Sequence, residues 1–566
     1  MGDWDVHLRS LSNSARDSSF SNDPASDPSL LHSVKRLNEL CRGEKSEDLV
    51  ARVYPQFNKL FQRAVASLSQ SNTPYGLLLL EILQFFLDFG DVVLHDADAS
   101  LRTFFRSCLS REFADPVVAE ATLDFLVAQK KKFLSQFPTL LPQFFPLMLK
   151  LIAWNGEKLE KKFLNVFPAL ISMGSFLPLF PSIVDLPVLV AALEKVEKGS
   201  GSLVGSSIAT MQKSTAPEML LALMDEAYTG STIGDGGVDF ESEDSAGIDV
   251  ADPLFLELLK DENDGLAFQE RQWASPIMAA LVQNAVNNPH SNRLMQSFII
   301  GPRLLGVYFS IAVREVNDSL ICSLIPLLMS RISSTFPDNG YSYEIQKRLL
   351  EFMLSAFQRS PNFIAILKKP IMDRLGEAYD SAAKTELALQ LCWAIGEHGG
   401  GGNAHKEVAC ELFESLELLL YENLAFSRLG IRQDSDVKSS GETHRRSLQS
   451  RLLCFVITSI AKLATRHQDL LPRARVALGK VARSRISDAC VRKRACDYLG
   501  LTSEPAISLS VLGPSQPSDD LIQNPGVVRW SEDGNGPTGY IPFYILGEQQ
   551  GPPFHDCSFS DLLPDR

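Results

Sequence analysis

The sequence is poor in cysteine and lacks any paired-cysteine motif. Nine cysteines are scattered over 566 residues, and no two of them form a Cys-x-x-Cys pair. An odd number of cysteines, mostly within apolar stretches, is typical of reduced cytosolic side chains in a core. A His-Glu-x-x-His pair is also lacking. We therefore expect no disulfide framework, no metal ion and no other cofactor.

The main catalytic signatures are missing as well. There is no Gly-x-x-x-x-Gly-Lys-Ser/Thr loop for a nucleotide phosphate and no Gly-x-Ser-x-Gly turn for a hydrolase nucleophile. His398 and the four glycines at 399–402 form a string that builds an oxyanion hole in some lipases. Without a nucleophile turn or a sheet, a helix end followed by a loop explains these residues better. His405 and Glu407 lack the spacing of a standard metal site. The sequence therefore predicts no enzymatic activity.

Positive charge is in deficit. The chain has 54 Lys and Arg against 68 Asp and Glu, a net charge of −14, which disfavours a dedicated nucleic-acid-binding protein. Residues 466–494, called the basic region below, are the exception, with nine Lys or Arg against two Asp. On a helical wheel Ala474, Ala477, Leu478 and Val481 gather on one side. The candidate contacts for an anionic membrane surface, an acidic partner or this chain's own acidic loop are Arg473, Arg475, Lys480, Arg483, Arg485, Arg492, Lys493 and Arg494.

The N-terminus lacks a basic segment followed by an apolar one, so no secretory signal is expected. Two long uncharged runs, 133–149 and 163–184, each contain three prolines. Proline at such intervals removes backbone hydrogen bonds that lipid cannot replace. We expect both runs to be buried helices and not membrane spans.

Helical periodicity dominates what remains. From Ser29 to Leu501 apolar residues recur at i, i+3, i+4 and i+7, and alternating strand patterns are nearly absent before residue 505. No tetratricopeptide or ankyrin consensus is visible. Degenerate antiparallel helix pairs of about 40 residues predict an all-α solenoid of the HEAT or armadillo class. The alternative is a set of compact helical bundles.

Composition divides the chain into five segments. Residues 229–253 hold seven acidic and no basic residues, which predicts a mobile acidic loop, and GVVRW and YIPFYIL in the tail predict a β-hairpin. The expected segments are a flexible N-terminus (1–28), an N-terminal half-solenoid (29–228), the acidic loop (229–253), a C-terminal half-solenoid (254–502, with a mobile loop at 432–445) and a Pro/Gly-rich tail (503–566).

One short motif points to a family. Trp393-Ala394-Ile395-Gly396-Glu397 resembles the Trp-x-Ile-Gly-Glu helix of adaptin trunks, the α-solenoids of vesicle adaptor complexes, although His398 stands where many adaptins have Tyr or Phe. From SLLHSVKRLNELCRG to SFSDLLPDR, most of the chain is similar to the zeta large subunits of the fifth adaptor-protein complex, in a plant-like form. In this resemblance Trp393, Ile395, Gly396 and Glu397 are structural residues of the motif.

The resemblance implies a non-enzymatic scaffold for endosomal and lysosomal protein sorting that does not use clathrin. Its implied partners are a beta-type adaptin, a medium (mu) and a small (sigma) subunit, and spatacsin- and spastizin-like proteins. The implied location is cytoplasmic, peripheral on late endosomal and lysosomal, vacuole-related membranes. An alternative is a nuclear or DNA-repair scaffold that uses the basic region, although this region has no aromatic residues for base stacking.

Overall fold

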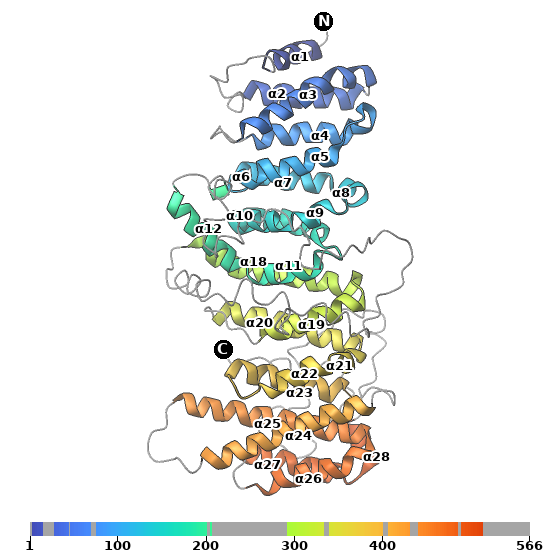
Figure 1. Ribbon diagram of the computed structural model, residues 1–566, viewed down its shortest axis with the longest axis vertical. Coiled ribbons are helices and arrows are strands. Elements are labelled where there is room, and N and C mark those ends of the chain that lie inside the picture. Colours follow the sequence, from blue (N-terminus) through green and yellow to red (C-terminus); the bar gives the residue numbers. More distant parts are fainter. Residues whose placement is uncertain are drawn as a thin grey trace, which may run out of the picture. The chain divides into compact units, whose positions relative to one another are not determined.

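The computed structural model consists of helices joined by short connections (Figure 1). It describes residues 3–14, 28–44, 46–68, 75–200, 204–205, 291–332, 339–399, 406–430, 440–484 and 488–512. These residues contain no strand, which confirms the all-α class for the described chain. The expected acidic loop at 229–253 and the expected hairpin of the tail lie outside the described residues.

The helices belong to two compact units. Residues described up to Tyr308 belong to the first unit, and those from Phe309 belong to the second. The division falls within α18 (Asn292–Glu315), whereas the sequence placed it at the acidic loop. The earlier helices of the first unit are α1 (Asp3–Ser14), α2 (Pro28–Glu44), α3 (Glu47–Ser67), α4 (Gly76–Val93), α5 (Ala97–Thr103), η2 (Phe104–Leu109), α6 (Ser110–Glu112), α7 (Pro116–Ala128), α8 (Lys130–Gln136), α9 (Leu140–Gln143), α10 (Phe145–Val166), η3 (Phe167–Leu170), α11 (Phe176–Val184) and α12 (Leu186–Ser200).

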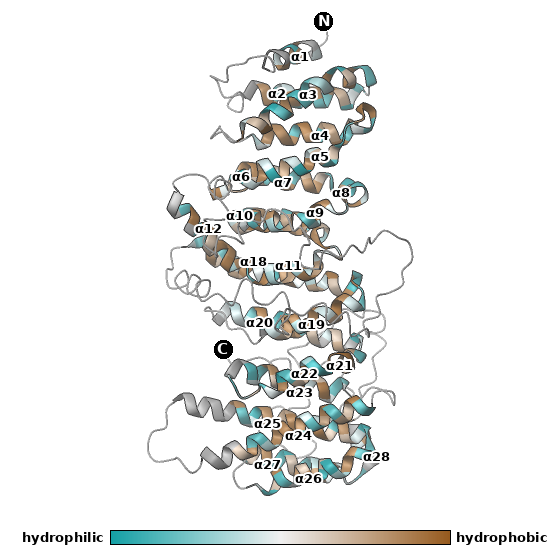
Figure 2. Ribbon diagram, in the orientation of Figure 1, coloured by the Kyte–Doolittle hydropathy of each residue, from teal (hydrophilic) through white to brown (hydrophobic). Residues whose placement is uncertain are grey.

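The second unit continues the helical pattern to Leu512. After the end of α18 it contains α19 (Asp318–Ile332), α20 (Asn339–Arg359), α21 (Asn362–Ile366), α22 (Lys368–Gly376), α23 (Ala382–His398), α24 (Lys406–Gly430), α25 (Ser440–Arg466), η5 (Gln468–Leu470), α26 (Leu471–Arg483), α27 (Ala489–Leu501) and α28 (Pro505–Leu512). Most of these helices carry both apolar and polar residues (Figure 2), so that one face of each is available for packing.

Short capping signals start several helices. Asp115 accepts hydrogen bonds from the amides of Val117 and Val118, and Pro116 occupies the first turn of α7. Asp96 caps α5 and Asp488 caps α27 in the same way. A side-chain oxygen at this position satisfies amides that have no partner within the helix. These capping side chains fix the residue at which each of these three helices begins.

The first unit is built of antiparallel helix pairs in two layers. The first helices of successive pairs are α2, α4, α7 and the part of α10 after Gly156, where a non-helical backbone (φ 30°) turns the chain. The second helices are α3, then α5 with η2, then the first part of α10, then α11. Equivalent positions in neighbouring pairs are therefore about 40 residues apart, as in HEAT and armadillo arrays.

Hydrogen bonds between neighbouring pairs show this repeat directly. The Asn38 amide donates to the Glu81 carbonyl 43 residues away, and the Asn155 amide donates to the Phe113 carbonyl over 42 residues. In the second unit the Tyr379 hydroxyl donates to the Leu419 carbonyl over 40 residues. The tetratricopeptide repeat has 34 residues and the HEAT or armadillo repeat about 40–47. The observed spacing matches the longer class.

Three expected segment boundaries need correction. Residues 3–14 form α1, which buries Leu11 and brings Trp4 beside the guanidinium of Arg52, so this stretch is not a flexible start. α25 begins at Ser440, inside the expected loop at 432–445. α28 extends the array into the expected tail, because Ser508 lies at hydrogen-bond distance (2.6 Å between hydroxyl oxygens) from Thr465 of α25.

The long apolar runs are divided among several helices. The run at 163–184 is shared among the end of α10, η3 and α11, and Pro168 lies at the start of η3. By length and composition alone, two helical segments of the described chain could cross a membrane, Asn292–Glu315 and Leu448–Arg466, and α11 with Leu186–Glu194 forms a pair bent by 62°. In Leu448–Arg466, 83% of the apolar window is buried against the protein's own helices.

Candidate functional site: the motif helix and the basic region

The Trp-x-Ile-Gly-Glu motif lies in the last turns of α23, which packs along α25 in the second unit (Figure 1). Ser381 caps the start of α23 by accepting a hydrogen bond from the Lys384 amide. Ala394 and Ile395 are fully buried. The motif is therefore part of a helix–helix interface inside this chain.

Gly396 allows the two helices to approach closely. A Cβ atom at this position would lie 2.8 Å from the Ser459 Oγ and 3.2 Å from the Ser459 Cα of α25. The Ser459 hydroxyl lies 2.6 Å from the Cys392 carbonyl oxygen and can donate to it. Glycine at a helix crossing removes the side chain that would separate the backbones. The motif glycine thus has a packing function at the crossing of α23 and α25.

Glu397 forms a buried ion pair with Lys462 of α25. The two side chains are 7% and 1% exposed. A second pair, between Glu386 and Arg451, joins the same two helices with a nitrogen–oxygen distance of 3.0 Å. Removing one partner of a buried pair leaves an uncompensated charge, which costs about 3–5 kcal/mol. These pairs hold α23 and α25 in one register.

Trp393 and His398 complete the end of α23. Their rings meet edge to face, with 6.0 Å between centroids. Burial, with smaller contributions from nearby Arg466 and Lys462, lowers the pKa of His398 to about 4, so its imidazole is neutral at physiological pH. Gly399 ends the helix with an amide that donates to the Ile395 carbonyl. Residues 400–405, including His405, lie outside the described chain.

The basic region runs from the last residue of α25 through η5 and α26 into α27 of the second unit. The predicted buried face of α26 is confirmed, because Ala474, Ala477, Leu478 and Val481 are all fully buried. The opposite face carries Arg473, whose guanidinium binds Glu414 (2.9 Å) and Glu417 (2.7 Å) of α24. This arginine is therefore neutralised within the chain and offers little charge to an external anion.

Other basic side chains of this region are also held by the protein. The Lys480 ammonium donates to the Tyr421 hydroxyl (3.0 Å) and lies 4.2 Å from the Tyr421 ring centroid. Arg475 donates to the Thr502 carbonyl, and Arg483 donates to the Gly479 carbonyl of its own helix. Arg475 and Arg483 are exposed despite these bonds. The region thus presents a weaker positive surface than the residue count suggests.

The expectation that Arg494 is a surface contact is wrong. Its side chain is 1% exposed, on the same face of α27 as Val491, Ala495 and Tyr498. The cap at Asp488 begins a new helix, and its inward face follows i, i+3, i+4 and i+7 from Val491. Lys493 is exposed, Arg492 is half-buried, and Arg485 lies outside the described residues.

The side chains that could bind a metal ion are scattered in the described chain. Within it, no group of three or more His, Cys, Asp or Glu side chains is arranged to hold a metal ion. The eight cysteines that the structure describes are free thiols, and five of them are buried. Burial raises the pKa of the Cys41 thiol to about 11, so this side chain is an unreactive filler of the core.

Comparison with known proteins identifies the family. A model described as "AP-5 complex subunit, vesicle trafficking" matches residues 25–150. A second, described as "AP-5 complex subunit zeta-1, C-terminal TPR repeats", matches residues 253–525, so the two span well over half of the chain. The chain belongs to the AP-5 zeta-subunit family. The AP-5 complex subunit zeta-1 of Homo sapiens is 26% identical over 452 residues, and that of Mus musculus is 25% identical over 456 residues.

The AP-5 zeta family match covers both candidate sites. The motif helix and the basic region lie within residues 253–525, and α2 to α9 lie within residues 25–150. Each alignment includes 77% of this chain but only 50% of the relative, so the chain spans about half the length of the curated relatives it matches. The repeats named TPR in the second model are, by their spacing here, closer to the HEAT or armadillo length.

Sequence reasoning missed the side chains that Gly396 and Glu397 of the motif contact. Ser459 and Lys462 are more than 60 residues from the motif, in a stretch that reads as an ordinary apolar helix. One signal was available, since Lys462 interrupts the apolar run of α25 and a lysine in such a run requires an acidic partner. The identity of that partner depended on the packing of α23 on α25.

Proposed function

We propose that this protein is a non-enzymatic scaffold subunit of a vesicle adaptor-protein complex, working in endosomal and lysosomal protein sorting without clathrin. The match of two AP-5 family models along the chain carries this proposal. The helical array supports it, because stacked helix pairs offer extended surfaces for several partners at once. The wider adaptin kinship and the plant-like form belong to the same proposal, supported by the Trp393–Glu397 motif.

The proposed partners are a beta-type adaptin, a medium and a small subunit, and spatacsin- and spastizin-like proteins. The proposed location is the cytoplasmic face of late endosomes and lysosomes, or vacuole-related membranes, as a peripheral protein. An obligate complex of this kind often buries more than about 2,000 Å². Such an interface survives mild lysis, which makes the partners accessible to direct capture.

Affinity capture of the tagged full chain tests the scaffold role. Mild lysis and mass spectrometry should recover a beta-type adaptin and a small subunit in near-equal amounts with the tagged chain. A matched control is the tagged Gly500→Ala chain, in which the added methyl group has no neighbour within 4 Å, so the same subunits should be recovered. Repeated capture of the chain alone, in both forms, would contradict the proposal.

The basic region is proposed as an auxiliary contact with an anionic membrane or acidic partner. Arg483 is exposed and Arg492 is half-buried, whereas Arg473 is paired with two glutamates. We therefore expect Arg483→Glu with Arg492→Glu to reduce endosomal recruitment without altering thermal stability. Arg473→Glu serves as the control, because it places a third negative charge beside Glu414 and Glu417 and should lower stability. Unchanged recruitment of the double variant would exclude this contact.

The nuclear or DNA-repair alternative has little support. The net charge of −14, the buried Arg494 and the paired Arg473 leave few side chains for phosphate contacts. A DNA titration at about 150 mM salt distinguishes the two functions, and we expect no saturable binding. Salt-dependent binding under these conditions would favour the alternative.

A further inference from the structure

One edge of the first unit displays large apolar side chains to solvent. The first helices of successive pairs run parallel to one another, so they all end at the same edge of the unit. The connection from the first to the second helix of each pair therefore lies at this edge. Three successive connections carry Leu94 (93% exposed), Leu134 (52%) and Met173 (65%). Their positions are 40 and 39 residues apart, which equals the repeat. We call these three residues the apolar row.

The members of the row lie side by side, as contacts of α8 show. The Lys132 ammonium donates to the Leu87 carbonyl (2.8 Å) near the end of α4. The Lys130 ammonium donates to the Asn165 carbonyl (2.8 Å) at the end of α10. α8 is thus held between these two helix ends, and it projects at this edge in Figure 1. Leu134, on α8, is consequently flanked by the connections that carry Leu94 and Met173.

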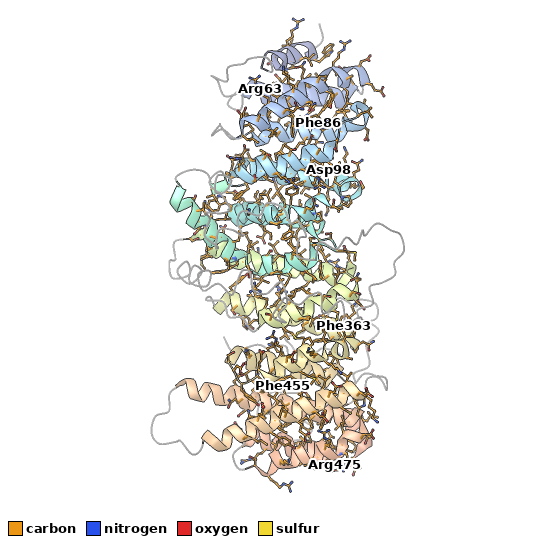
Figure 3. The ribbon with its side chains drawn as sticks, in the orientation of Figure 1. Arg63, Phe86, Asp98, Phe363, Phe455 and Arg475 are labelled. Carbon is orange, nitrogen blue, oxygen red and sulfur yellow. The ribbon has the colours of Figure 1, made fainter. Side chains whose placement is uncertain are left out.

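Leu94 is displayed at a cost to the fold. It is the one described non-glycine residue with a positive φ (53°), in the left-handed region that favours Gly or Asn. The next residue, His95, explains the constraint. Its ring nitrogens lie 3.1 Å from the Tyr54 hydroxyl and 2.9 Å from the Ser100 hydroxyl, and its ring packs on Phe86 with 3.9 Å between centroids. Phe86 is labelled in Figure 3.

Leu94 is held rigidly outward in a strained turn. If this position served folding alone, leucine would be an unexpected choice. Asn or Gly would relieve the backbone, and a polar side chain would remove the exposed apolar surface. Strain of this kind is found where structure is fixed for binding. Apolar residues beside the row enlarge the surface, since Val92 is 49% and Val127 37% exposed.

The spacing of the row matches an α-helix. Packed helices lie about 8–10 Å apart, so neighbouring connections are separated by roughly the same distance. Seven residues of an α-helix rise about 10.5 Å. A helix lying along the edge would therefore meet Leu94, Leu134 and Met173 with side chains at i, i+7 and i+14, the pattern of an amphipathic helix on an apolar surface.

The charges beside the row have different signs along it. Asp91 and Asp96 are exposed beside Leu94, whereas Lys131 is exposed beside Leu134. The acidic end would repel an anionic lipid surface, which disfavours a membrane as the occupant. A helix with a basic residue near the side chain that meets Leu94 and an acidic residue near the side chain that meets Leu134 would complement both charges. Such complementarity also fixes the direction of the bound helix.

We propose that the apolar row binds one amphipathic helix of a partner protein, through apolar side chains about seven residues apart. Leu94 is the principal contact, since it is the most exposed of the three and is held by a rigid turn. This inference rests on the geometry of the first unit and does not depend on the proposed function.

Site-specific photo-crosslinking in cells tests the proposal with the full chain. A benzophenone amino acid is placed in turn at positions 94, 134 and 173, and at Val117 as a control. Val117 is 58% exposed at the opposite end of α7. The three row positions should crosslink to one segment of one protein, at residues that advance by about seven per position. Crosslinks to lipid, to this chain or to unrelated segments, or none, would overturn the proposal.

A second variant separates binding from folding. Leu94→Asn should raise the melting temperature by about 2–4 °C, because it relieves the left-handed turn. In the same full chain it should lower the crosslinking yield from position 134 at least about tenfold, the loss typical of an interface residue that contributes much of the binding energy. An unchanged yield would contradict binding at the row. A lower melting temperature would show that the backbone at Leu94 is not strained, and it would contradict the argument that Leu94 is held outward at a cost to the fold.

Discussion

At the scale of single residues, Gly396 has a function that its motif alone does not explain. The position lacks space for a methyl group because Ser459 of α25 lies against the helix backbone. The sequence pointed to the five-residue motif, and the structure shows why its glycine and glutamate are there. The partners of both residues, Ser459 and Lys462, could not be predicted, since they depend on how two distant helices cross.

Gly396→Ala should destabilise the second unit by about 1–3 kcal/mol, because the methyl group forces α23 and α25 apart. Gly500→Ala in α27 is the matched control, since the new methyl group has no neighbour within 4 Å and alanine favours helix by up to about 1 kcal/mol. Thermal unfolding of the full-length variants measures both effects. Equal stability of the two variants would show that the helix crossing does not require glycine.

At the scale of helices, ion pairs join three successive repeats of the first unit. Asp88 of α4 binds Arg42 of α2 (2.6 Å) and Lys132 of α8 (2.8 Å). Burial raises the pKa of Asp88, but the hydrogen bonds and charges of Lys132 and Arg42 outweigh it and lower the pKa overall. This carboxylate therefore fixes the register of three neighbouring helix pairs.

Asp88→Asn should lower the stability of the first unit, because both charge-assisted contacts weaken. Solvent partly screens the two basic partners, which limits the loss to about 1–2 kcal/mol. Asp98→Asn is the control (Figure 3 labels Asp98), since its pair with Arg102 lies within one helix and contributes at most about 0.5 kcal/mol. Thermal melts at low and high salt measure the difference. The idea fails if the two variants lose the same stability.

Helix phase was predictable only where the sequence showed where the helix begins. The buried face of α26 followed correctly from its apolar spacing, and those four residues are buried. The phase of α27 did not follow, because Asp488 caps a new helix and turns Arg494 inward. The repeat class was readable from helix length and periodicity. The outward position of Leu94 could not be read from the sequence, because it results from the contacts of the next residue, His95, with Tyr54 and Ser100.

At the scale of the whole molecule, the two units contain different buried titratable groups. In the second unit, burial lowers the pKa values of His398, to about 4, and of His467. Histidines with depressed pKa values stabilise the folded state above pH 6.5 and lose this contribution as the pH falls. In the first unit, burial lowers the pKa of His95 but raises that of Glu112 to about 7.

Glu112 has the opposite pH dependence. Its carboxylate accepts hydrogen bonds from the amides of Tyr75 (2.9 Å) and Gly76 (2.8 Å) at the start of α4, yet its burial is the larger effect. An acid whose folded pKa is raised stabilises the fold below its unfolded pKa of about 4.5, and this contribution disappears as the pH rises through 7. In the first unit, acidification therefore strengthens one contribution and weakens another.

Lowering the pH from 7.5 to 5.5 should consequently weaken the second unit more than the first. Hydrogen exchange of the full chain, followed by mass spectrometry and corrected for the intrinsic pH dependence of exchange, measures each unit separately. Peptides from α23 and α25 should lose protection at pH 5.5, while those from α4 and α7 change little. Glu112→Gln removes the opposing contribution and should make the first unit acid-sensitive as well. Uniform loss of protection in the unmodified chain would show that these buried groups do not control its pH response.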